Sequence, residues 1–439
     1  MNPRLAVISF PGNNCEVESL RAAERNGFDA KLILWNEPEK LADFDAYFLI
    51  GGFSFEDRGR SGAIAAREPI FDVLRSEAQK GKIILGVCNG AQMIVESGLI
   101  PIGDNPVPFA LAENIRRDTS EHVLGTGYYN EWVHLTLERK DTAFTGKAQN
   151  ILRVPIAHGE GRFTSRDKNA QEALLSGKNV AFRYCDKKGV VSDQFPITPN
   201  GAFAATAMVV NDEGTIGAIM PHPERFYDAF DGDQIFQSMN AWISEHRSPK
   251  SVGIGKFETS QVEKIDPLSQ SKNSLFLEKK LIITDNEAFS VSQAASSIAG
   301  EKMHLEKSWL YSIEFEPKNS QGSNSEMRKK ILDSGLILNE NKEVLLPDPS
   351  PKDTSSPRSN KYAVFPLEDD TATALGEKLS TLLKRKVRVK IYTCWNFKNT
   401  SEKAIKKVFQ NRLLANPNAA QIFALGKQPS FRFQIKQVL

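Results

Sequence analysis

One short stretch constrains the fold of this chain more than any other: an apolar strand that runs into a Gly-x-Cys-x-Gly turn and then a helix. The apolar run Ile83–Leu85 leads into Gly86-Val87-Cys88-Asn89-Gly90, and Ala91–Ser97 follows with a helical pattern. A turn this sharp crowds the backbone, so the flanking glycines leave room where a Cβ atom would clash. The pattern predicts an elbow that presents Cys88 at the edge of a sheet and at the N-terminus of a helix, where thiolate is favoured.

The first 248 residues repeat this alternation of short apolar runs and helical segments. The alternation predicts an α/β fold with an open, mostly parallel sheet and helices on both faces. Ligands of such sheets bind beyond the carboxyl ends of the strands, so we expect the chemistry in the loops that follow them. Besides the elbow, we expect strands at Leu5–Phe10, Ala30–Trp35, Tyr47–Ile50 and Ile216–Met220 and a helix at Glu16–Asn26.

Charge divides the chain into two parts. The 439 residues are 40% hydrophobic and 25% charged, as in ordinary globular proteins, and their formal net charge is only +2. Residues 1–249 carry 26 Lys and Arg against 33 Asp and Glu, whereas residues 250–439 carry 30 against 21. We predict an α/β domain at 1–248, a polar linker at 249–274 and a C-terminal α+β domain at 275–439.

The second half alternates again, and we interpret it as one or two small α+β layers. A polar stretch at 347–360 interrupts the alternation. Predicted strands are Leu281–Thr284, Trp309–Phe315, Tyr362–Leu367 and Val387–Thr393, and predicted helices are Phe289–Ile298, Ser325–Ser334, Ala372–Lys384 and Glu402–Leu413.

Several classes of protein are excluded. The run Leu5–Phe10 is too short for a secretion signal or a membrane span, and nothing elsewhere approaches 18 consecutive apolar residues. Four cysteines without a Cys-x-x-Cys pair indicate neither a disulfide framework nor a zinc site. The basic cluster at 384–390 fits a solvated strand face better than a nucleic-acid site. We expect a cytoplasmic protein that binds no metal, membrane or nucleic acid.

A thiol nucleophile needs a base and a group that orients the base, and Pro221-His222-Pro223-Glu224 supplies both. His222 follows a predicted strand, so a parallel sheet can bring it beside Cys88. Glu224 falls on the same side of an extended chain, which Pro223 favours for the residue before it. We predict that Cys88, His222 and Glu224 form a catalytic triad.

A Gly-rich strand end supplies candidate donors for an oxyanion. Gly51-Gly52-Phe53-Ser54 follows the strand predicted at Tyr47–Ile50. Backbone N–H groups there, together with the N–H of Asn89 after the nucleophile, can bind the negative oxygen of a tetrahedral intermediate.

Together these motifs resemble the class I, or triad, glutamine amidotransferases, and among them the PurQ-type glutaminase subunits of phosphoribosylformylglycinamidine synthase. The resemblance spans residues 1 to about 246. The matching motifs are Gly51-Gly52-Phe53-Ser54 with Ser61-Gly62-Ala63-Ile64-Ala65, Gly86-Val87-Cys88-Asn89-Gly90-Ala91-Gln92, Pro155-Ile156-Ala157-His158-Gly159-Glu160-Gly161-Arg162, Pro199-Asn200-Gly201 and Met220-Pro221-His222-Pro223-Glu224-Arg225.

The resemblance implies a division of labour in purine biosynthesis. Cys88 attacks the carboxamide of L-glutamine, His222 supplies a proton to the leaving ammonia, and water hydrolyses the thioester to glutamate. Contacts to the substrate or the oxyanion are implied for Gly52, Asn89, Gln92 and His158. The ammonia passes to a large synthetase subunit, which converts formylglycinamide ribonucleotide into formylglycinamidine ribonucleotide. ATP and Mg²⁺ are expected on that partner, and no cofactor is expected at the triad.

Two parts of the chain depart from this family pattern or extend it. After Phe55 the common family form continues Gly-Asp, whereas this chain has Glu56-Asp57-Arg58. The order of elements in the second half, with Leu413-Leu414-Ala415-Asn416-Pro417 near its end, resembles PurS, a small bridging subunit. A doubled PurS-like layer would account for one extra strand-helix unit.

Two other functions stay open at this point. The triad is compatible with an amidotransferase that serves a different synthetase. A scaffolding subunit without catalysis is the alternative from another class, although such a subunit would have no physical need for Cys88, His222 and Glu224 together.

Overall fold

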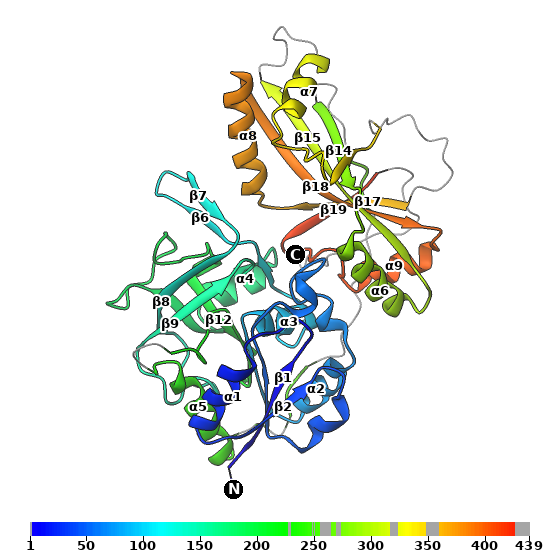
Figure 1. Ribbon diagram of the computed structural model, residues 1–439. Coiled ribbons are helices and arrows are strands. Elements are labelled where there is room, and N and C mark those ends of the chain that lie inside the picture. The colour runs from blue at the N-terminus through cyan, green and yellow to red at the C-terminus, as the bar shows by residue number, and fades with distance from the viewer. Residues whose placement is uncertain are drawn as a thin grey trace. The chain divides into compact units, whose positions relative to one another are not determined.

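The structure is a computed structural model that describes residues 2–226, 230–247, 249, 251–254, 265–268, 274–316, 324–347 and 360–425. The chain forms two compact units, Met1–Glu258 and Thr259–Leu439, each with its own main β-sheet (Figure 1). Within the described ranges, no helix is both long enough and apolar enough to cross a membrane.

The first unit combines one large sheet with two small two-stranded ribbons. Its strands and helices are β1 (Arg4–Ser9), α1 (Glu16–Arg25), β2 (Asp29–Leu34), β3 (Ala46–Leu49), α2 (Ile70–Gln79), β4 (Ile83–Val87), α3 (Asn89–Ser97), β5 (Ala110–Ala112), β6 (Ile115–Arg117), β7 (Val123–Thr126), β8 (Tyr129–Leu137), β9 (Ile151–His158), β10 (Arg162–Thr164), α4 (Lys168–Leu175), β11 (Val180–Cys185), β12 (Thr206–Val210), β13 (Ile216–Ile219) and α5 (Asp233–Ser244).

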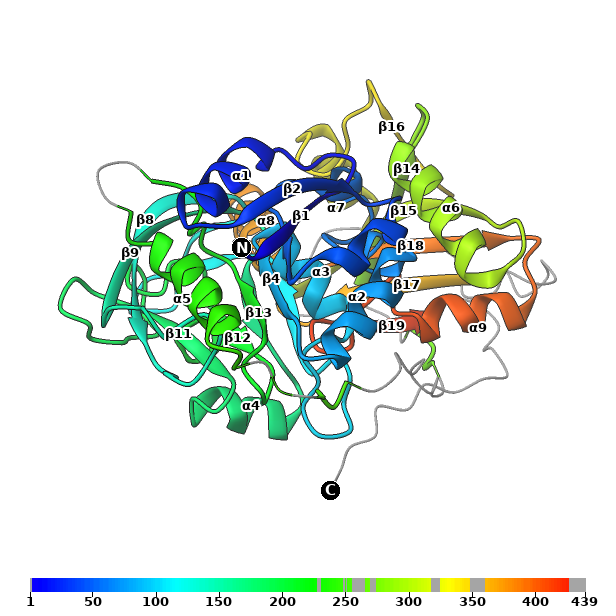
Figure 2. The same cartoon turned by 90° about the horizontal axis from the view of Figure 1, so that it is seen from below.

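The large sheet confirms the predicted α/β class. Its strand order is β2-β1-β3-β4-β13-β12-β11-β8-β9. The first five strands are mutually parallel and each later pair is antiparallel, so seven of the nine strands that the structure describes in this sheet run in one direction. Helices α1 and α5 lie on one face and α2 and α3 on the other (Figure 2).

The strands at the centre of the sheet are apolar along their whole length because helices cover both faces. Every residue of β3, β4 and β13 is buried. The strands and the helix predicted for this unit are confirmed, with bounds that differ by one or two residues.

The strand order decides where the chemistry can lie. The chain leaves β1 toward β2 on one side and later returns to β3 on the other, so the helices that follow lie on opposite faces and a crevice opens at the carboxyl ends. The loops after β1, β3, β4 and β13 meet at this edge. They carry, respectively, Cys15, Gly51, Cys88 and His222.

Residues 251–254, which fall in the predicted linker, pack against the first unit. Val252 and Ile254 are only 5% and 4% exposed and belong to its hydrophobic core. The backbone N–H of Val252 donates to the Gln79 carbonyl at 3.0 Å, and the Gln79 side chain donates to the Ile254 carbonyl at 2.8 Å. Most of the remaining predicted linker lies outside the described residues.

The second unit is α+β, with an antiparallel sheet of order β16-β14-β15-β18-β17-β19 in its described residues. Its long strands β15 and β18 pair along 13 residues each. The elements are β14 (Ser274–Leu281), α6 (Asn286–Ala299), β15 (His304–Glu316), α7 (Asn324–Asp333), β16 (Glu343–Leu345), β17 (Asn360–Pro366), α8 (Asp370–Leu383), β18 (Lys386–Lys398), α9 (Glu402–Gln410) and β19 (Ala420–Ala424).

This order of elements is an internal duplication. The sequence β14-α6-β15-α7-β16 is repeated as β17-α8-β18-α9-β19, and the sheet places the first repeat as third-first-second strand and the second as second-first-third. Such a mirror order is what a two-fold axis between β15 and β18 produces. Trp309 faces Thr393 across these strands. These two positions are 84 residues apart, which is also the spacing between equivalent positions of the two repeats. The pseudo-two-fold axis therefore passes between Trp309 and Thr393.

Hydrogen bonds repeat at the same spacing of 84 residues. Asp285 caps α6 by accepting from the N–H of Ala288, and Asp369 caps α8 in the same way from Ala372. The Ser296 hydroxyl accepts from the N–H seven residues later at 2.9 Å, and Ser380 does the same at the same distance.

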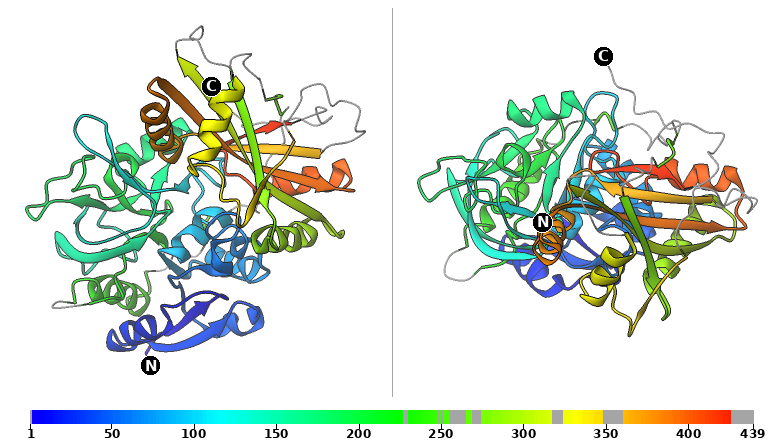
Figure 3. Two further views of the ribbon diagram at one scale, coloured as in Figure 1. Left: turned by 45° about the horizontal axis from the view of Figure 1, so that its top comes forward. Right: turned by 90° about the horizontal axis from the view of Figure 1, so that it is seen from above.

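The two repeats are interlocked. The first helix of each repeat contacts the second helix of the other, α6 against α9 and α8 against α7 (Figure 3). Each repeat therefore completes its packing with helices of the other.

Most elements predicted in the second half are confirmed, but the strand predicted at Leu281–Thr284 is wrong. The structure has β14 at Ser274–Leu281, where Leu275 and Leu277 are buried. Ile282 and Ile283 lie beyond the end of this strand and are 57% and 58% exposed, so their apolar character misplaced the prediction. The short strands β16 and β19 were not predicted. The polar stretch at 347–360 lies largely outside the described residues.

Candidate active site

The predicted elbow is present between β4 and α3. Cys88 occupies the N-cap of α3 with φ 51° and ψ −108°, a strained conformation for a residue with a side chain. Its backbone N–H donates to the Ile219 carbonyl of β13 at 2.8 Å, which ties the elbow to the neighbouring strand. A Cβ atom on Gly90 would lie 2.0 Å from the Leu49 carbonyl oxygen. The glycine therefore lets α3 approach β3 closely enough to form the turn.

The loops that carry Cys15, Cys88 and His222 converge around the backbone of Gly51. A Cβ built on Gly51 would lie 2.8 Å from Cε1 of His222, 3.1 Å from Sγ of Cys15 and 3.4 Å from Cβ of Cys88. The absence of a side chain at Gly51 is thus what lets the imidazole and the two thiol residues lie around one backbone position.

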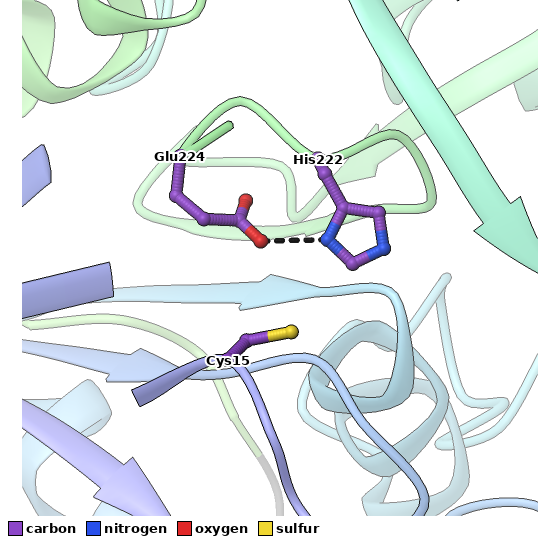
Figure 4. A group of neighbouring side chains, drawn as sticks. All are labelled: Cys15, His222 and Glu224. Carbon is purple, nitrogen blue, oxygen red and sulfur yellow. Dashed lines mark hydrogen bonds and ion pairs between the residues drawn. The ribbon is translucent and has the colours of Figure 1, made fainter. Parts of the chain in front are cut away.

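His222 and Glu224 form a buried pair at the end of β13. Nδ1 of His222 and Oε1 of Glu224 are 2.6 Å apart, and each residue is 1% exposed (Figure 4). The His222 backbone N–H donates to the Pro155 carbonyl of β9 at 2.8 Å, which fixes the loop. Glu224 therefore holds the ring in one orientation and keeps a proton on Nδ1.

The charge of this pair is set by its neighbours. Burial alone would lower the pKa of His222, but the Glu224 carboxylate and the thiols of Cys88 and Cys15 outweigh it and raise that pKa well above its usual value. Nε2 of His222 makes no hydrogen bond within the described part of the chain. The imidazole is therefore stabilised as a cation, the state it reaches after taking a proton from a thiol.

Asn89 and Gln92, predicted near the oxyanion, anchor the loop after β3 and the strand end of β9. Asn89 is fully buried, and its side-chain oxygen accepts from the backbone N–H of Ser54 at 3.0 Å. Its amide nitrogen donates to Oε1 of Gln92 at 2.8 Å. Gln92 in turn donates to the Glu160 carbonyl at 2.6 Å. Both side chains are used within the protein, and the backbone N–H of Asn89 stays the candidate oxyanion donor.

Gly52 lies where the sequence placed it, directly after β3. Its φ is 133°, and a Cβ there would lie 2.5 Å from Cα of Asn13. The loop that follows contains three successive residues with positive φ, Phe55, Glu56 and Asp57, at 51°, 56° and 53°. Glu56 thus occupies, at left-handed backbone angles, the position where the related family pattern has glycine.

This loop also contains an ionisable group with a shifted pKa, the carboxyl group of Asp57. Burial and the nearby charge of Glu160 raise the pKa of Asp57 to about 7. Its Oδ1 atom accepts a long hydrogen bond of 3.4 Å from Asn89. Asp57 therefore joins the loop to the elbow, and its carboxyl group keeps a proton at pH values where an ordinary aspartate is ionised.

His158 lies buried at the end of β9. Asn114 donates to its carbonyl at 2.6 Å and contacts its Nδ1 at 3.1 Å. Burial, with a further contribution from the charge of His222, lowers the pKa of His158 to about 3. The imidazole is neutral, and with Nδ1 accepting from Asn114 the ring proton lies on Nε2. The preceding residue, Ala157, accepts a hydrogen bond from Sγ of Cys88 at 3.8 Å.

Sequence reasoning missed two residues that border the triad, Cys15 and Arg225. Cys15 is fully buried at the N-cap of α1, and Nη2 of Arg225 donates to its sulfur at 3.2 Å. Burial raises the pKa of the Cys15 thiol, although the nearby His222 opposes this. The rule that chemistry follows strand ends would have pointed to Pro11-Gly12-Asn13-Asn14-Cys15, which follows β1.

A pocket of about 380 Å³ opens beside this group. It is lined by Glu18, Asn130, Trp132, Pro155, Glu224, Arg225 and Phe226. Arg225 also forms an ion pair with Glu18 at 3.5 Å. Glu224 thus borders both the buried imidazole and this pocket.

The first unit is similar in sequence to a known protein family and to named relatives. Residues 2–251 match the family described as CobB/CobQ-like glutamine amidotransferase domain. A protein of Methanothrix thermoacetophila named phosphoribosylformylglycinamidine synthase subunit PurQ is 40% identical over 263 residues, which cover 56% of this chain and all of the relative. The protein of the same name from Methanopyrus kandleri is 39% identical over 245 residues, covering 54% of this chain and 98% of the relative.

This chain is also similar to one chain of a solved structure, which is described as the structure of PurLQS from Thermotoga maritima; the two chains are 34% identical. The match covers 55% of this chain and 100% of that chain, with a TM-score of 0.44.

Proposed function

This chain belongs to the CobB/CobQ-like glutamine amidotransferase family, and we propose that it is the glutaminase component of phosphoribosylformylglycinamidine synthase. The proposal is supported by the curated relatives, which carry that name and are matched over 98% to 100% of their length. The family match ends at residue 251, near the end of the first unit.

In the proposed reaction, Cys88 is the nucleophile. Its sulfur attacks the side-chain carbonyl carbon of L-glutamine, and the thiol proton passes to Nε2 of His222. The tetrahedral intermediate collapses when the C–N bond breaks, and His222 returns the proton to the leaving ammonia. Water, deprotonated by the same nitrogen, then hydrolyses the thioester and releases glutamate. Glu224 stabilises the imidazolium in both halves of the reaction.

The negative oxygen of both intermediates needs donors that are fixed before the reaction. The backbone N–H of Asn89 and that of Gly52 are the proposed donors, since both follow central strands at the edge where Cys88 lies. The Asn89 side chain, which binds the Ser54 N–H, holds these two loops in register. His158 and Gln92 are proposed to shape the substrate side of the site.

One observation supports this proposal more strongly than any other. Cys88 is held at φ 51° on one strand end while an adjacent parallel strand carries a buried His222–Glu224 pair with an Nδ1 to Oε1 distance of 2.6 Å. Strain of this kind persists only where the surrounding structure enforces it, and it is typical of nucleophile elbows.

The word subunit in the relatives' name indicates that those proteins act within a larger enzyme. We propose that the ammonia formed here passes to a large synthetase subunit that converts formylglycinamide ribonucleotide into formylglycinamidine ribonucleotide. ATP and Mg²⁺ are proposed to bind that partner, and the triad needs neither for amide hydrolysis.

The second unit is proposed to be a fused, PurS-like bridging module. Its two interlocked β-α-β-α-β repeats support a role in assembly, because they form a covalently joined equivalent of a small two-fold dimer. This module would hold the glutaminase at the synthetase.

The test is glutamate release from glutamine by the full chain, with and without the synthetase subunit, ATP and formylglycinamide ribonucleotide. The expected result is stimulation by the partner that disappears in Cys88→Ala. Ammonia-dependent synthesis by the complex should survive in Cys88→Ala. The matched control is Cys185→Ala, another buried cysteine that lies on β11.

Other outcomes would favour the competing functions. Glutaminase activity that ignores this synthetase would indicate a different acceptor. Loss of both glutamine-dependent and ammonia-dependent synthesis in Cys88→Ala would indicate a scaffold.

A further inference from the structure

A second thiol borders the triad without a role in the proposed reaction. Sγ of Cys15, a ring nitrogen of His222 and a carboxylate oxygen of Glu224 all lie within 4.8 Å of one another. All three residues are buried, and Figure 4 shows their side chains directed toward a common point. They come from opposite ends of the first unit's sequence and meet because β1 and β13 end at the same edge of the sheet.

We propose that Cys15, His222 and Glu224 form a binding site for a soft divalent cation of the Zn²⁺ type, and that the bound cation switches the glutaminase off. The binding part of this inference is independent of the proposed function, whereas the inhibition rests on it.

The donor set matches the chemistry of such a cation. One thiolate, one imidazole nitrogen and one carboxylate oxygen are the three kinds of protein ligand that Zn²⁺ takes, and three protein ligands leave the fourth tetrahedral position for water. Bonds of about 2.0–2.3 Å place tetrahedral ligands about 3.4–3.7 Å apart. Sγ of Cys15 therefore has to move closer by up to about 1 Å, whereas Nδ1 of His222 and Oε1 of Glu224, now 2.6 Å apart, have to separate by about 1 Å. Side-chain rotation of Cys15 and Glu224 can supply both movements.

Glu224 has unused bonding capacity. Its Oε2 is a buried atom with no hydrogen-bond partner among the described residues. Buried polar atoms are usually paired, so this orphan oxygen points to a further group that binds here.

The cation has a route to the site, and it displaces the hydrogen bond between Arg225 and Cys15 and, when it takes Nδ1, the one between His222 and Glu224. The pocket of about 380 Å³ borders Glu224 directly, and the carboxylate of Glu18 lies in its lining. Arg225 donates to Sγ of Cys15 at 3.2 Å and must release that sulfur. Its guanidinium already forms an ion pair with Glu18 at 3.5 Å, so it keeps a partner when it does.

Binding blocks the proposed base in either orientation. If the cation takes Nδ1 of His222, the neutral ring carries its proton on Nε2 and that atom can no longer accept the proton of Cys88. If the cation takes Nε2, the accepting atom is occupied. Glutamine hydrolysis therefore stops although Cys88 itself is untouched.

Cobalt(II) provides a test that does not depend on activity, because a thiolate bound to Co²⁺ gives a charge-transfer absorption band. The full chain is titrated with Co²⁺ under a non-thiol reductant. We expect the band in the wild type and in Cys88→Ser, Cys185→Ser and Cys394→Ser, and its loss in Cys15→Ser. In Glu224→Gln the band should persist with an affinity about tenfold weaker.

The inhibition is measured as glutamate release at increasing Zn²⁺, each variant relative to its own metal-free rate. A shift of at least tenfold in the inhibitory Zn²⁺ concentration for Cys15→Ser, with recovery of the wild type by a chelator, supports the switch. Equal inhibition of Cys15→Ser and wild type overturns it. A cobalt band that is absent from the wild type, or that depends on Cys88 instead of Cys15, overturns the site itself.

If the chain releases no glutamate under any condition, the proposed function fails and the cobalt titration still decides the site. If the band is absent while glutamate release is normal, the metal site fails and the proposed function stands.

Discussion

Nδ1 of His222 and Oε1 of Glu224 lie 2.6 Å apart in a pair that is almost completely shielded from solvent. The carboxylate is a main cause of the raised pKa of the imidazole, so the two groups act as one acid-base unit.

Replacing Glu224 by Gln should lower turnover by about 10²–10⁴-fold, because the neutral amide neither stabilises the imidazolium nor fixes the tautomer. The same change should lower the pKa of His222. Glutamate release as a function of pH measures both effects. Glu24→Gln, an exposed residue of α1, is the matched control. Turnover of Glu224→Gln within twofold of wild type would remove Glu224 from the triad.

Replacing Gly51 by Ala should disable the site with little effect on the fold. The new methyl group would lie 2.8 Å from the His222 ring and must displace it. Because a misplacement of about 1 Å costs about 10²-fold, we expect at least that loss in turnover. Gly146→Ala, where nothing lies within 4 Å of the added atom, should match the wild type. Equal turnover of the two variants would contradict the convergence at Gly51.

Replacing Glu56 by Gly should stabilise the protein. Glu56 has φ 56°, and relief of that strain should raise the free energy of unfolding by about 0.5–1 kcal/mol. Its ion pair with Arg58 is exposed and contributes little. Chemical denaturation measures the change, with Glu56→Ala as the control that loses the ion pair but keeps the strain. A similar gain in both variants would show that strain is not the cause.

Replacing Asp57 by Asn should remove a pH dependence of stability. The folded-state pKa of Asp57 is about 7, above the ordinary value of 3.8, so the folded state binds the proton more tightly than the unfolded state does. That stabilisation is complete below about pH 4 and is lost as the pH rises toward 7.

Between pH 5 and pH 8, wild type should therefore lose about 2 kcal/mol relative to Asp57→Asn, a value discounted for partial exposure. Denaturant unfolding at the two pH values provides the measurement. Asp43→Asn, an exposed carboxyl, should follow the wild type. Parallel pH profiles for wild type and Asp57→Asn would contradict the assignment.

A fragment that ends at residue 248 should be less stable than one that ends at Glu258. The shorter fragment lacks Val252 and Ile254, whose burial is worth about 2–4 kcal/mol together. Urea denaturation of the two fragments tests this. Both should retain glutamine hydrolysis without the synthetase if the first unit carries the chemistry. Identical unfolding midpoints would show that residues 249–254 contribute nothing.

The sequence predicted the first unit well because its signals are local. Five consecutive residues around Cys88 are enough to predict the elbow. The apolar runs of β4 and β13 predict buried strands, because such runs are unfavourable in contact with water. The placement of His222 and Cys88 around Gly51 agrees with the general rule that parallel strands end at one edge.

What the sequence did not predict depends on contacts between distant segments. Cys15 lies 207 residues before His222, and only the folded sheet shows that they are neighbours. The sequence suggested a doubled layer in the second half but did not locate the two repeats, because few equivalent positions keep their residue type. Gly300 and Lys384 both end a helix in the left-handed conformation, and nothing in those two residue types suggests a repeat.

The duplication frees the second unit from a restriction that true dimers obey. In a homodimer, a residue on the axis must face its own copy, and any substitution appears on both sides at once. Here Trp309 faces Thr393, a large ring against a small side chain, and Ser308 faces Cys394 where the equivalent pair is Leu310 and Tyr392. Because the halves are joined in one chain, each can vary alone, and the module can present two different faces to two different neighbours while folding independently of protein concentration.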